Sequence, residues 1–231
     1  MNVLIMAAGA LGGYIGGEIS KHHNVMLIAR NQHLQEIQKN GLVIKSITSG
    51  DFICKSEVHK RPPKDYVADL VIYCVKSYHN NKAIPIIKNS ITDNTTILTL
   101  QNGIGSGEFL ASHFGKDKVV LGAAYIDASI SGYGVVQEYG GNCKIVFGNY
   151  NGSDKYHTEK IKNILTPTKI KQEMSKQILT TIWGKLIFIS GLSGMTCITN
   201  STFDEIISYN QTKNTTKLLI TETYDVAIAS G

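Results

Sequence analysis

The chain has 231 residues, of which 42% are hydrophobic and 18% are charged. This is the composition of a soluble globular protein with one large domain or two modest ones. Scattered basic residues give a net charge of +5, which argues against nucleic acid as a partner and slightly favours small anionic ligands.

Residues 1–30 have the pattern of a strand, a glycine turn, a helix and a second strand. The apolar run 2–6 is typical of a strand covered on both faces. Such a unit seats a dinucleotide pyrophosphate on a helix N-terminus, where Gly9 lets the backbone approach the phosphates and Gly12 lets the helix pack on the strand. Ala7 stands where the first glycine is usual, so the turn must accommodate a methyl group. The turn comprises Ala7, Ala8, Gly9, Ala10, Leu11 and Gly12.

Arg30 ends the second strand of this unit, whose apolar run covers residues 25–29. An NAD-binding unit carries an acid here, about 20 residues after the glycines, to bind the ribose hydroxyls. A guanidinium can instead pair with a 2′-phosphate through two hydrogen bonds, which favours NADP over NAD. The alternative is that Arg30 is a solvated cation at the end of a strand.

Helical and strand patterns alternate up to residue 173. This alternation predicts an α/β fold over residues 1–173, with a Rossmann-type doubly wound parallel sheet. Gly41 ends the expected helix 33–40, and Asp154 caps the expected helix 154–165. The expected helices are 33–40, 81–89, 108–114 and 154–165; the strands are 69–75, 96–100 and 119–125; a hairpin covers 42–58 and an antiparallel edge meander 127–148.

Two polar segments follow strands of the predicted sheet. Lys76 and Ser77 come after the strand 69–75, and Gln101-Asn102-Gly103 comes after the strand 96–100. Taken alone, Asn102-Gly103 would be an ordinary turn. Ligands of doubly wound sheets bind at the carboxyl ends of the strands, however, so Lys76 and Asn102 become candidate cofactor contacts.

Residues 174–231 change to a helical period and form the start of a helical domain. Ile178, Ile182, Lys185 and Ile189 share one helix face. A lysine in such a stripe usually extends its amine to water. If water is out of reach, desolvation lowers the pKa of Lys185 and makes it a proton donor near neutral pH. A later helix is expected over 214–229.

The remaining patterns argue against several other classes of protein. The four cysteines, Cys54, Cys74, Cys143 and Cys197, lack the spacing of a metal site, so we expect small core residues in a reducing compartment and no metal. We expect no signal peptide, because the sequence opens directly on an apolar strand pattern, and no apolar run of membrane-spanning length. We therefore expect a cytoplasmic protein without a membrane partner.

Together these residues resemble the ketopantoate reductase (2-dehydropantoate 2-reductase) family. The resemblance implies a Rossmann domain followed by a helical domain, with the site in the cleft between them. It also implies NADPH-dependent reduction of the 2-oxo acid 2-ketopantoate to pantoate, for pantothenate synthesis. The matching pieces, in family order, are Ala10-Leu11-Gly12-Gly13, Arg30, Cys74-Val75-Lys76-Ser77, Gln101-Asn102-Gly103 and Trp183-Gly184-Lys185-Leu186.

The resemblance also assigns roles to single residues. It implies that residues 7–12 and Arg30 hold the NADP phosphates and that Lys76 lies near the cofactor. Asn102 would contact the nicotinamide side and the substrate, and Ala128 would lie along the cofactor. Lys185 would be the general acid that protonates the nascent alkoxide.

The chain departs from the family pattern in two ways. Ile189 and Ser193 replace asparagines that the family carries four and eight residues after the lysine, which indicates altered substrate specificity. The family also continues past residue 231, with a serine for substrate and a glutamate for cofactor. We therefore expect a truncated helical domain in which helix 214–229 has an uncovered apolar face, leading to a homodimer or an unstable chain.

Two other functions remain open. The chain could be an NADP-binding remnant or sensor without turnover. It could also be a related 2-hydroxyacid or polyol-phosphate dehydrogenase, which likewise uses a lysine on a helix of the second domain.

Overall fold

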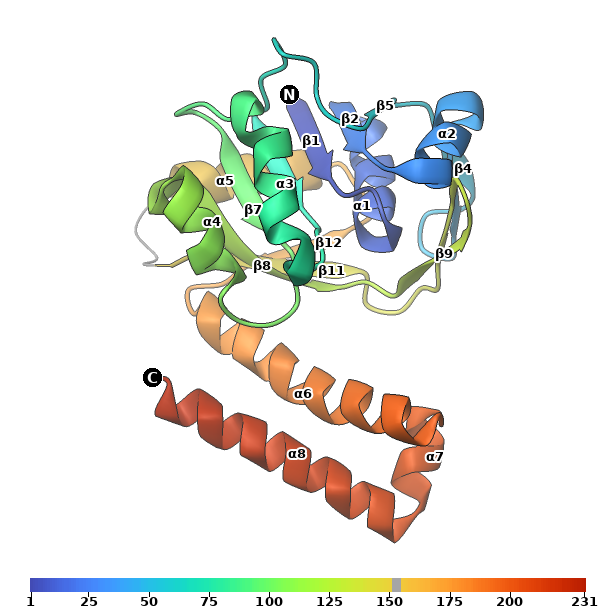
Figure 1. Ribbon diagram of the computed structural model, residues 1–231, viewed down its shortest axis with the longest axis vertical. Helices are drawn as coiled ribbons and strands as arrows, with labels where there is room; N and C mark the ends of the chain where they lie inside the picture. Colours follow the sequence, from blue (N-terminus) through green and yellow to red (C-terminus); the bar gives the residue numbers. More distant parts are fainter. Residues whose placement is uncertain (151–154) are drawn as a thin grey trace. The chain divides into compact units, whose positions relative to one another are not determined.

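Two units make up residues 1–150 and 155–231, the part of the chain that this computed structural model describes (Figure 1). Unit 1 consists of Met1–Gln101 and Gly105–Ile178, and unit 2 consists of Asn102–Ile104 and Leu179–Gly231. The predicted helix cap Asp154 lies outside the described residues.

An eight-stranded sheet forms the centre of unit 1 (Figure 1). Strands β5, β2, β1, β6, β7 and β8 are parallel neighbours in that order, and β11 pairs antiparallel with β8. The α/β doubly wound fold is therefore confirmed. The strands are β1 (Asn2–Met6), β2 (Asn24–Ile28), β5 (Glu57–His59), β6 (Leu70–Tyr73), β7 (Thr96–Thr99), β8 (Val119–Tyr125), β11 (Lys144–Asn149) and β12 (Lys171–Met174).

The strand order reverses between β1 and β6. From β1 the chain builds outward through β2 and β5, and it then returns to the other side of β1 with β6, β7 and β8. The β1–β6 pair runs in parallel register from Val3 opposite Leu70 to Met6 opposite Tyr73. The crevice beyond the carboxyl ends of these two strands is where open α/β sheets bind their ligands.

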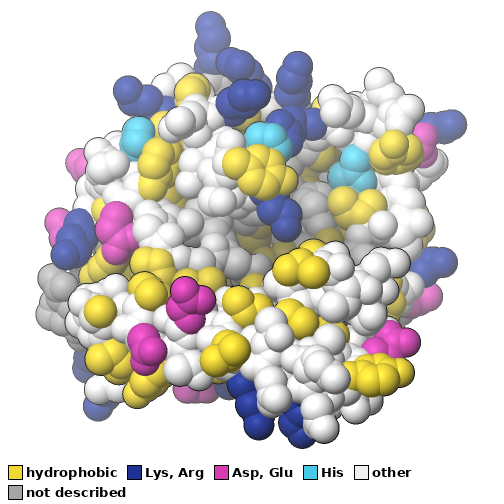
Figure 2. Space-filling model, turned by 60° about the horizontal axis from the view of Figure 1, so that its bottom comes forward, with side chains coloured by type: hydrophobic (Ala, Val, Ile, Leu, Met, Phe, Trp, Pro, Cys, Tyr) yellow, Lys and Arg dark blue, Asp and Glu magenta, His cyan; other side chains and the backbone are white. Residues whose placement is uncertain are grey.

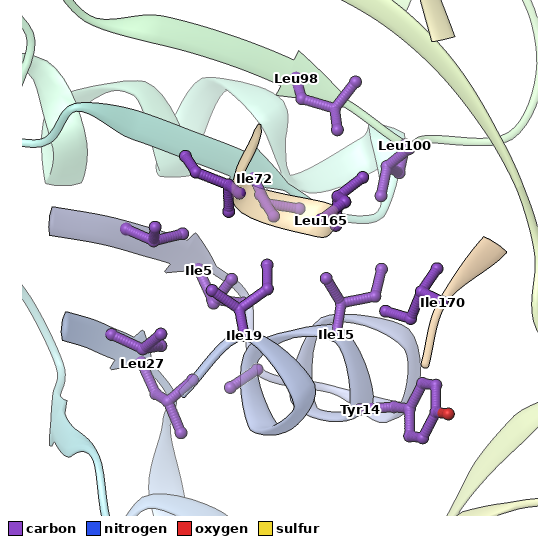
Figure 3. Packing of buried hydrophobic residues seen from close by; sticks show 14 of the residues in the cluster. Ile5, Tyr14, Ile15, Ile19, Leu27, Ile72, Leu98, Leu100, Leu165 and Ile170 are labelled. Atoms are coloured by element: carbon purple, nitrogen blue, oxygen red, sulfur yellow. The ribbon is translucent and has the colours of Figure 1, made fainter. Parts of the chain in front are cut away.

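Helices cover both faces of the large sheet. Helices α1 (Ala10–Ser20) and α5 (Lys155–Leu165) share one hydrophobic cluster on one face. In Figure 3, Ile15 and Ile19 of α1 point toward the sheet, and Leu165 of α5 joins the same packing. The opposite face carries α3 (Asn80–Ile87) and α4 (Ser106–Phe114), as the reversed strand order requires (Figure 1). Helix α2 (Asn31–Asn40) ends at Gly41, as predicted.

A second, four-stranded sheet was not foreseen in the sequence. Its order is β4 (Phe52–Cys54), β3 (Leu42–Ser46), β10 (Val135–Glu138) and β9 (Ala128–Gly132). The predicted hairpin forms between β3 and β4, but its second arm splits, and β5 joins the large sheet. The predicted edge meander is wrong, because β9 and β10 belong to the small sheet and β11 alone returns to the large one.

A buried carboxylate explains why β10 pairs with β3. Glu138 is fully buried and accepts hydrogen bonds from Ser46 Oγ at 2.6 Å, Thr48 N at 3.0 Å and Gly140 N at 2.6 Å. Burial alone would raise the pKa of Glu138, but these hydrogen bonds outweigh it and hold the pKa below its usual value. Ser46 and Thr48 are about ninety residues from Glu138 in the sequence, so these contacts hold the small sheet together.

Helix α1 lies between the two sheets, and its glycines allow both to approach. A Cβ at Gly16 would lie 2.8 Å from side-chain atoms of Ile5 and Leu27 in the large sheet. A Cβ at Gly17 would lie 3.0 Å from Ile44 in the small sheet. The small-residue helix start therefore sets the spacing of two sheets, beyond the packing on one strand that the turn motif predicts.

Unit 2 contains the long helices α6 (Ile178–Thr199) and α8 (Asn210–Ala229), joined by the short α7 (Phe203–Ser208). Helix α7 was not predicted, although Thr202 and Glu205 form a capping box at its start. Helix α8 begins earlier than the predicted residue 214. Helices α6 and α8 contact each other through side chains: Thr223 Oγ1 donates to Ser190 Oγ at 2.9 Å.

Much of the hydrophobic surface of unit 2 is open to solvent. Leu218, Val226 and Ile228 on α8 are 69%, 53% and 65% exposed, which agrees with the uncovered face predicted for this helix. Figure 2 shows exposed hydrophobic side chains, coloured yellow, on the face that is turned toward the reader. The expectation that no apolar run has membrane-spanning length is wrong: in the described part of the chain, α6 is long and apolar enough to cross a membrane by length and composition, with a mean hydropathy of 1.4. One such helix is weak evidence for a membrane span.

Candidate active site

The turn after β1 presents an open helix N-terminus. Gly9 is the N-cap residue of α1, and no side chain caps this helix. Its first backbone amides can therefore bind an anion such as a pyrophosphate. Ala8 N donates to the Ile28 carbonyl oxygen at 2.8 Å, which ties the turn to the end of β2. Ala7 has φ of +77°, so the methyl group at the usual glycine position is accommodated in a left-handed conformation that is costly for alanine.

A cavity of about 340 Å³ opens in front of this turn, at the point where the strand order reverses. Its wall is built from the glycine turn, the end of β2, the loop after β6, helix α3 and the β9–β10 hairpin. The lining residues are Met6, Ala7, Ala8, Gly9, Ile28, Ala29, Arg30, Asn31, His33, Val75, His79, Lys82, Ala83, Ile86, Ile130 and Tyr133.

The charge of this cavity is positive. Arg30 and Lys82 both line it, and no acid is among the lining residues. Both cations have exposed side chains. A site that joins an open helix N-terminus to two cations suits a ligand with several phosphate groups. The residues that are present therefore suit a dinucleotide.

The structure brings some of the predicted cofactor residues together and leaves others away from the cavity. Ala7, Ala8, Gly9 and Arg30 line it, whereas Lys76 is exposed at the N-cap of the short helix η1 (Ser77–His79) and is not in the lining. Ala10, Leu11 and Gly12 form the first turn of α1. They follow Ala7, Ala8 and Gly9, the part of the glycine turn that lines the cavity and that we call the phosphate turn. Asn102 is exposed, and Ala128 begins β9 and packs half-buried against the core.

Gln101 has a structural part in the polar segment after β7. Its side-chain amide donates to the Val75 carbonyl oxygen at 2.7 Å and to Asn80 Oδ1 at 2.8 Å. These bonds hold the loop after β6 against the start of α3. They therefore position the wall of the cavity that carries His79 and Lys82.

Lys185 lies half-buried on α6 in unit 2. Burial lowers the pKa of Lys185 to about 8. The sequence left two alternatives for this lysine, an amine that reaches water and a desolvated amine. The lowered pKa agrees with the desolvated amine. Ile189 and Ser193 follow one and two turns later on the same helix, half-buried and exposed respectively.

The described residues contain no cluster of three His, Cys, Asp or Glu side chains that could hold a metal. All four cysteines are free, and Cys54 and Cys143 are buried, as the sequence predicts. The prediction is wrong for Cys197, which is exposed on α6. The surface of α6 is largely uncovered in unit 2, so an apolar residue on it need not be in a core.

Sequence reasoning missed several residues of the cavity. Lys82 and Ile86 come from α3, His79 ends the short helix η1, and Tyr133 comes from the β9–β10 hairpin. No motif marks these positions in the sequence. A helical projection of α3 would have placed Lys82 and Ile86 on one face, since they are four residues apart.

A parallel sheet in this strand order, with a cationic cavity at its reversal point, defines a dinucleotide-binding protein of the Rossmann type. Comparison with known families agrees with this class. The family described as "Ketopantoate reductase PanE/ApbA" matches residues 3–152, and its C-terminal part matches residues 177–231. The chain therefore belongs to the ketopantoate reductase family, whose members are NAD(P)-dependent oxidoreductases that reduce 2-oxo acids.

Individual relatives support the same assignment. The uncharacterized oxidoreductase YkpB of Bacillus subtilis is 27% identical over 232 residues, which cover 100% of this chain and 76% of YkpB. The 2-dehydropantoate 2-reductase of Halobacterium salinarum is 24% identical, with 100% and 76% covered. The crystal structure of a 2-dehydropantoate 2-reductase from Geobacter metallireducens has a TM-score of 0.93 at 25% identity, with 100% and 76% covered.

A D-mandelate dehydrogenase, solved with NADH and anilino(oxo)acetate, has the same fold. Its TM-score is 0.91 at 22% identity, and the match covers 100% of this chain and 74% of that one. The fold is therefore shared by proteins named for different 2-hydroxy or 2-oxo acids, and it does not by itself specify a substrate.

Proposed function

We propose that this chain catalyses the NADPH-dependent reduction of a 2-oxo acid, with 2-dehydropantoate as the first candidate substrate. The observation that carries the proposal is the cavity at the strand reversal, where an open helix N-terminus adjoins Arg30 and Lys82 without an acid. The membership of the ketopantoate reductase family supports the reaction class.

In this proposal the cofactor is NADP(H) rather than NAD(H). The backbone of Ala7, Ala8, Gly9, Ala10, Leu11 and Gly12 binds the pyrophosphate at the start of α1. Arg30 pairs with the 2′-phosphate, and Lys82 adds a second positive charge at the same cavity. Lys76, Asn102 and Ala128 stay predicted cofactor contacts, on the family resemblance.

The chemistry proposed for Lys185 is proton donation. A bound NADPH would supply a hydride to the ketone carbon of the substrate. The ammonium of Lys185 then gives its proton to the oxygen of the former carbonyl, which yields the 2-hydroxy acid and leaves a neutral amine to be reprotonated from water. A pKa of about 8 suits this role, because the proton is held at neutral pH and released readily.

Ile189 and Ser193 are the proposed substrate residues, one and two turns after Lys185. Because an isoleucine cannot hydrogen-bond a hydroxyl or a carboxylate, the pocket would read a less polar side chain than a pair of asparagines would. This observation favours a second candidate, the reduction of a 2-oxo acid with an apolar or aromatic side chain. Here the D-mandelate dehydrogenase with its bound anilino(oxo)acetate is the relevant relative.

Rates of NADPH oxidation with 2-dehydropantoate and with phenylglyoxylate test these proposals directly. Turnover of either substrate that is lost in Lys185→Ala, with NADPH affinity retained, supports the reductase, and the preferred substrate selects between the two candidates. The matched control is Lys217→Ala, an exposed lysine on α8. NADPH binding without turnover of any 2-oxo acid would instead indicate a nucleotide-binding remnant or sensor.

We also propose that the protein acts in the cytoplasm, since its substrate and cofactor are small soluble molecules. A homodimer is the proposed state for unit 2, because the exposed apolar face of α8 could be covered by a second copy. Measurement of the molar mass in solution tests this state.

A further inference from the structure

His33 connects the phosphate turn to the β9–β10 hairpin. Its Nε2 lies 2.9 Å from the Ala8 carbonyl oxygen, and Gly134 N donates to its Nδ1 at 3.0 Å. The two partners are 126 residues apart in the sequence, and both segments line the cavity through Ala8 and Tyr133. His33 itself lies half-buried in the first turn of α2 and also lines the cavity.

These two contacts require one protonation state of the imidazole. The Gly134 amide can only donate, so Nδ1 must accept and carry no proton. The Ala8 carbonyl can only accept, so Nε2 must carry the proton. Both bonds therefore exist only with the neutral Nε2–H form. Burial lowers the pKa of His33, which agrees with a neutral ring.

The bond to Ala8 determines where an amide of the phosphate turn points. In a trans peptide the carbonyl of Ala8 and the N–H of Gly9 point in opposite directions. The amide of Ala8 is already held by Ile28, so a second bond at its carbonyl leaves the next peptide plane little freedom. The direction of Gly9 N–H, at the N-cap of α1, is thereby fixed by His33.

The bond to Gly134 holds the other wall of the cavity. Gly134 has φ of +72°, and a Cβ there would lie 3.0 Å from Glu36 Cβ of α2. The hairpin is thus held close against α2, with His33 Nδ1 receiving its turn amide. Tyr133, next to Gly134, is 62% exposed and lines the cavity.

We propose that His33 is a positioning residue for the dinucleotide, which in its neutral form orients the phosphate turn and holds the Tyr133 hairpin against the cavity. The proposal rests on the proposed function only in that a nicotinamide dinucleotide binds here. When Nδ1 is protonated, it can no longer accept a hydrogen bond from the Gly134 amide, because both groups are then donors. The link between His33 and the hairpin is therefore lost. The affinity for the dinucleotide then falls as the pH falls below the usual histidine range.

Other charged or titratable groups at this place are Arg30 and Glu36 on either side of His33 in sequence, His79 at the end of η1 and Lys82 on α3. His79 is a second imidazole at the cavity, so it needs a control variant of its own. The 2′-phosphate of NADPH has a second pKa of about 6, so it would add its own pH dependence. The probe is therefore ADP-ribose, which has the pyrophosphate but no 2′-phosphate, and His79→Gln is the control variant.

Two amide substitutions separate the two bonds of His33. In His33→Gln the amide nitrogen stands three bonds from Cβ, as Nε2 does, and can donate to Ala8. In His33→Asn the amide oxygen stands two bonds from Cβ, as Nδ1 does, and can accept from Gly134. Neither side chain titrates. Thermal melting of each variant shows that unit 1 is folded before binding is compared.

The measurement is the Kd of ADP-ribose between about pH 5 and about pH 8, by calorimetry. In the wild type and in His79→Gln, we expect Kd to rise as the pH falls. In both His33 variants we expect a flat profile, with His33→Asn weaker than the wild type at neutral pH by about five- to tenfold, the equivalent of one lost hydrogen bond. His33→Gln keeps the bond to Ala8 but lacks the one to Gly134, so at neutral pH it should bind as weakly as the wild type does at low pH.

Three results would overturn the proposal: a pH dependence that persists in the His33 variants, a pH dependence that disappears in His79→Gln, or wild-type affinity in folded His33→Asn. A wild-type chain that does not bind ADP-ribose would overturn it as well. A chain that binds ADP-ribose with this pH profile but reduces no 2-oxo acid would refute the proposed function and leave the role of His33 intact.

Discussion

The pH profile of the reduction, measured for the wild type and for Lys185→Arg, tests the proposed proton donor. Burial lowers the pKa of Lys185 from 10.5 to about 8. A donor with this pKa loses about tenfold of its protonated form between about pH 7 and about pH 9. A lysine with the ordinary value would stay almost fully protonated over the same range. The rate of reduction should therefore fall as the pH rises through about 8.

The assay is kcat/KM for the 2-oxo acid at saturating NADPH over this range of pH. The sign should reverse for oxidation of the 2-hydroxy acid, because the neutral amine is then the required form. Arginine stays charged at all these pH values, so Lys185→Arg should be slower and show no fall near pH 8. Lys217→Ala should keep the wild-type profile. A flat wild-type profile, or an unchanged fall in Lys185→Arg, would refute the role of Lys185.

Three further predictions concern unit 1. Arg30→Ala should weaken NADPH binding by about tenfold or more, the value of a charge-assisted hydrogen bond, and leave NADH binding unchanged; an unchanged NADPH/NADH ratio in a binding titration would remove Arg30 from the phosphate site. Gly16→Ala should lower the free energy of unfolding by about 1–2 kcal/mol, because overpacking against Ile5 and Leu27 exceeds the gain in helix propensity. Urea titration measures it, and Gly184→Ala on α6, where the added methyl meets nothing within 4 Å, should give the opposite sign. Ala7→Gly should raise the free energy of unfolding by about 0.5–1 kcal/mol, since relief of the left-handed strain exceeds the added chain entropy; lower stability in urea would contradict the strain at φ +77°.

The large sheet could be predicted because its strands are buried on both faces. A run such as residues 2–6 or 119–125 is then nearly continuous in apolar residues and stands out in the sequence. The ends of the elements were less accurate. Helix α8 begins at Asn210 rather than at residue 214, because its first turn is polar and exposed and shows no apolar period.

The small sheet could not be predicted, since its strands are short and its pairing is remote in sequence. Strand β10 pairs with β3 across about ninety residues, and buried hydrogen bonds to Glu138 specify that pairing. A single glutamate in a sequence looks like a solvated surface residue. The run 52–58 divides between two sheets at residues 55–56, which the alternation of its residues does not reveal.

The candidate site was predictable only where a local motif carries it. The glycine turn and Arg30 belong to one strand–helix–strand unit, so the spacing alone places them together. Lys82, His33 and Tyr133 come from three other elements, and only the tertiary fold brings them to the cavity. Lys185 was recognised by its place in an apolar stripe, but its lowered pKa depends on burial, which a helical period does not determine.

Helix α1 links ligand binding to the stability of unit 1. Its N-terminus carries the proposed phosphate site, while its body is held between two sheets by Gly16 and Gly17. A dinucleotide at that N-terminus therefore stabilises the element on which both sheets pack, and its binding energy adds to the stability of unit 1 by mass action. The proposed proton donor lies on α6, in the other unit. Loss of turnover with cofactor binding retained is thus the expected result of a change at Lys185, whereas a change at Ala7 or Arg30 should alter binding first. This separation is what allows binding and rate measurements together to distinguish a reductase from a protein that only holds the nucleotide.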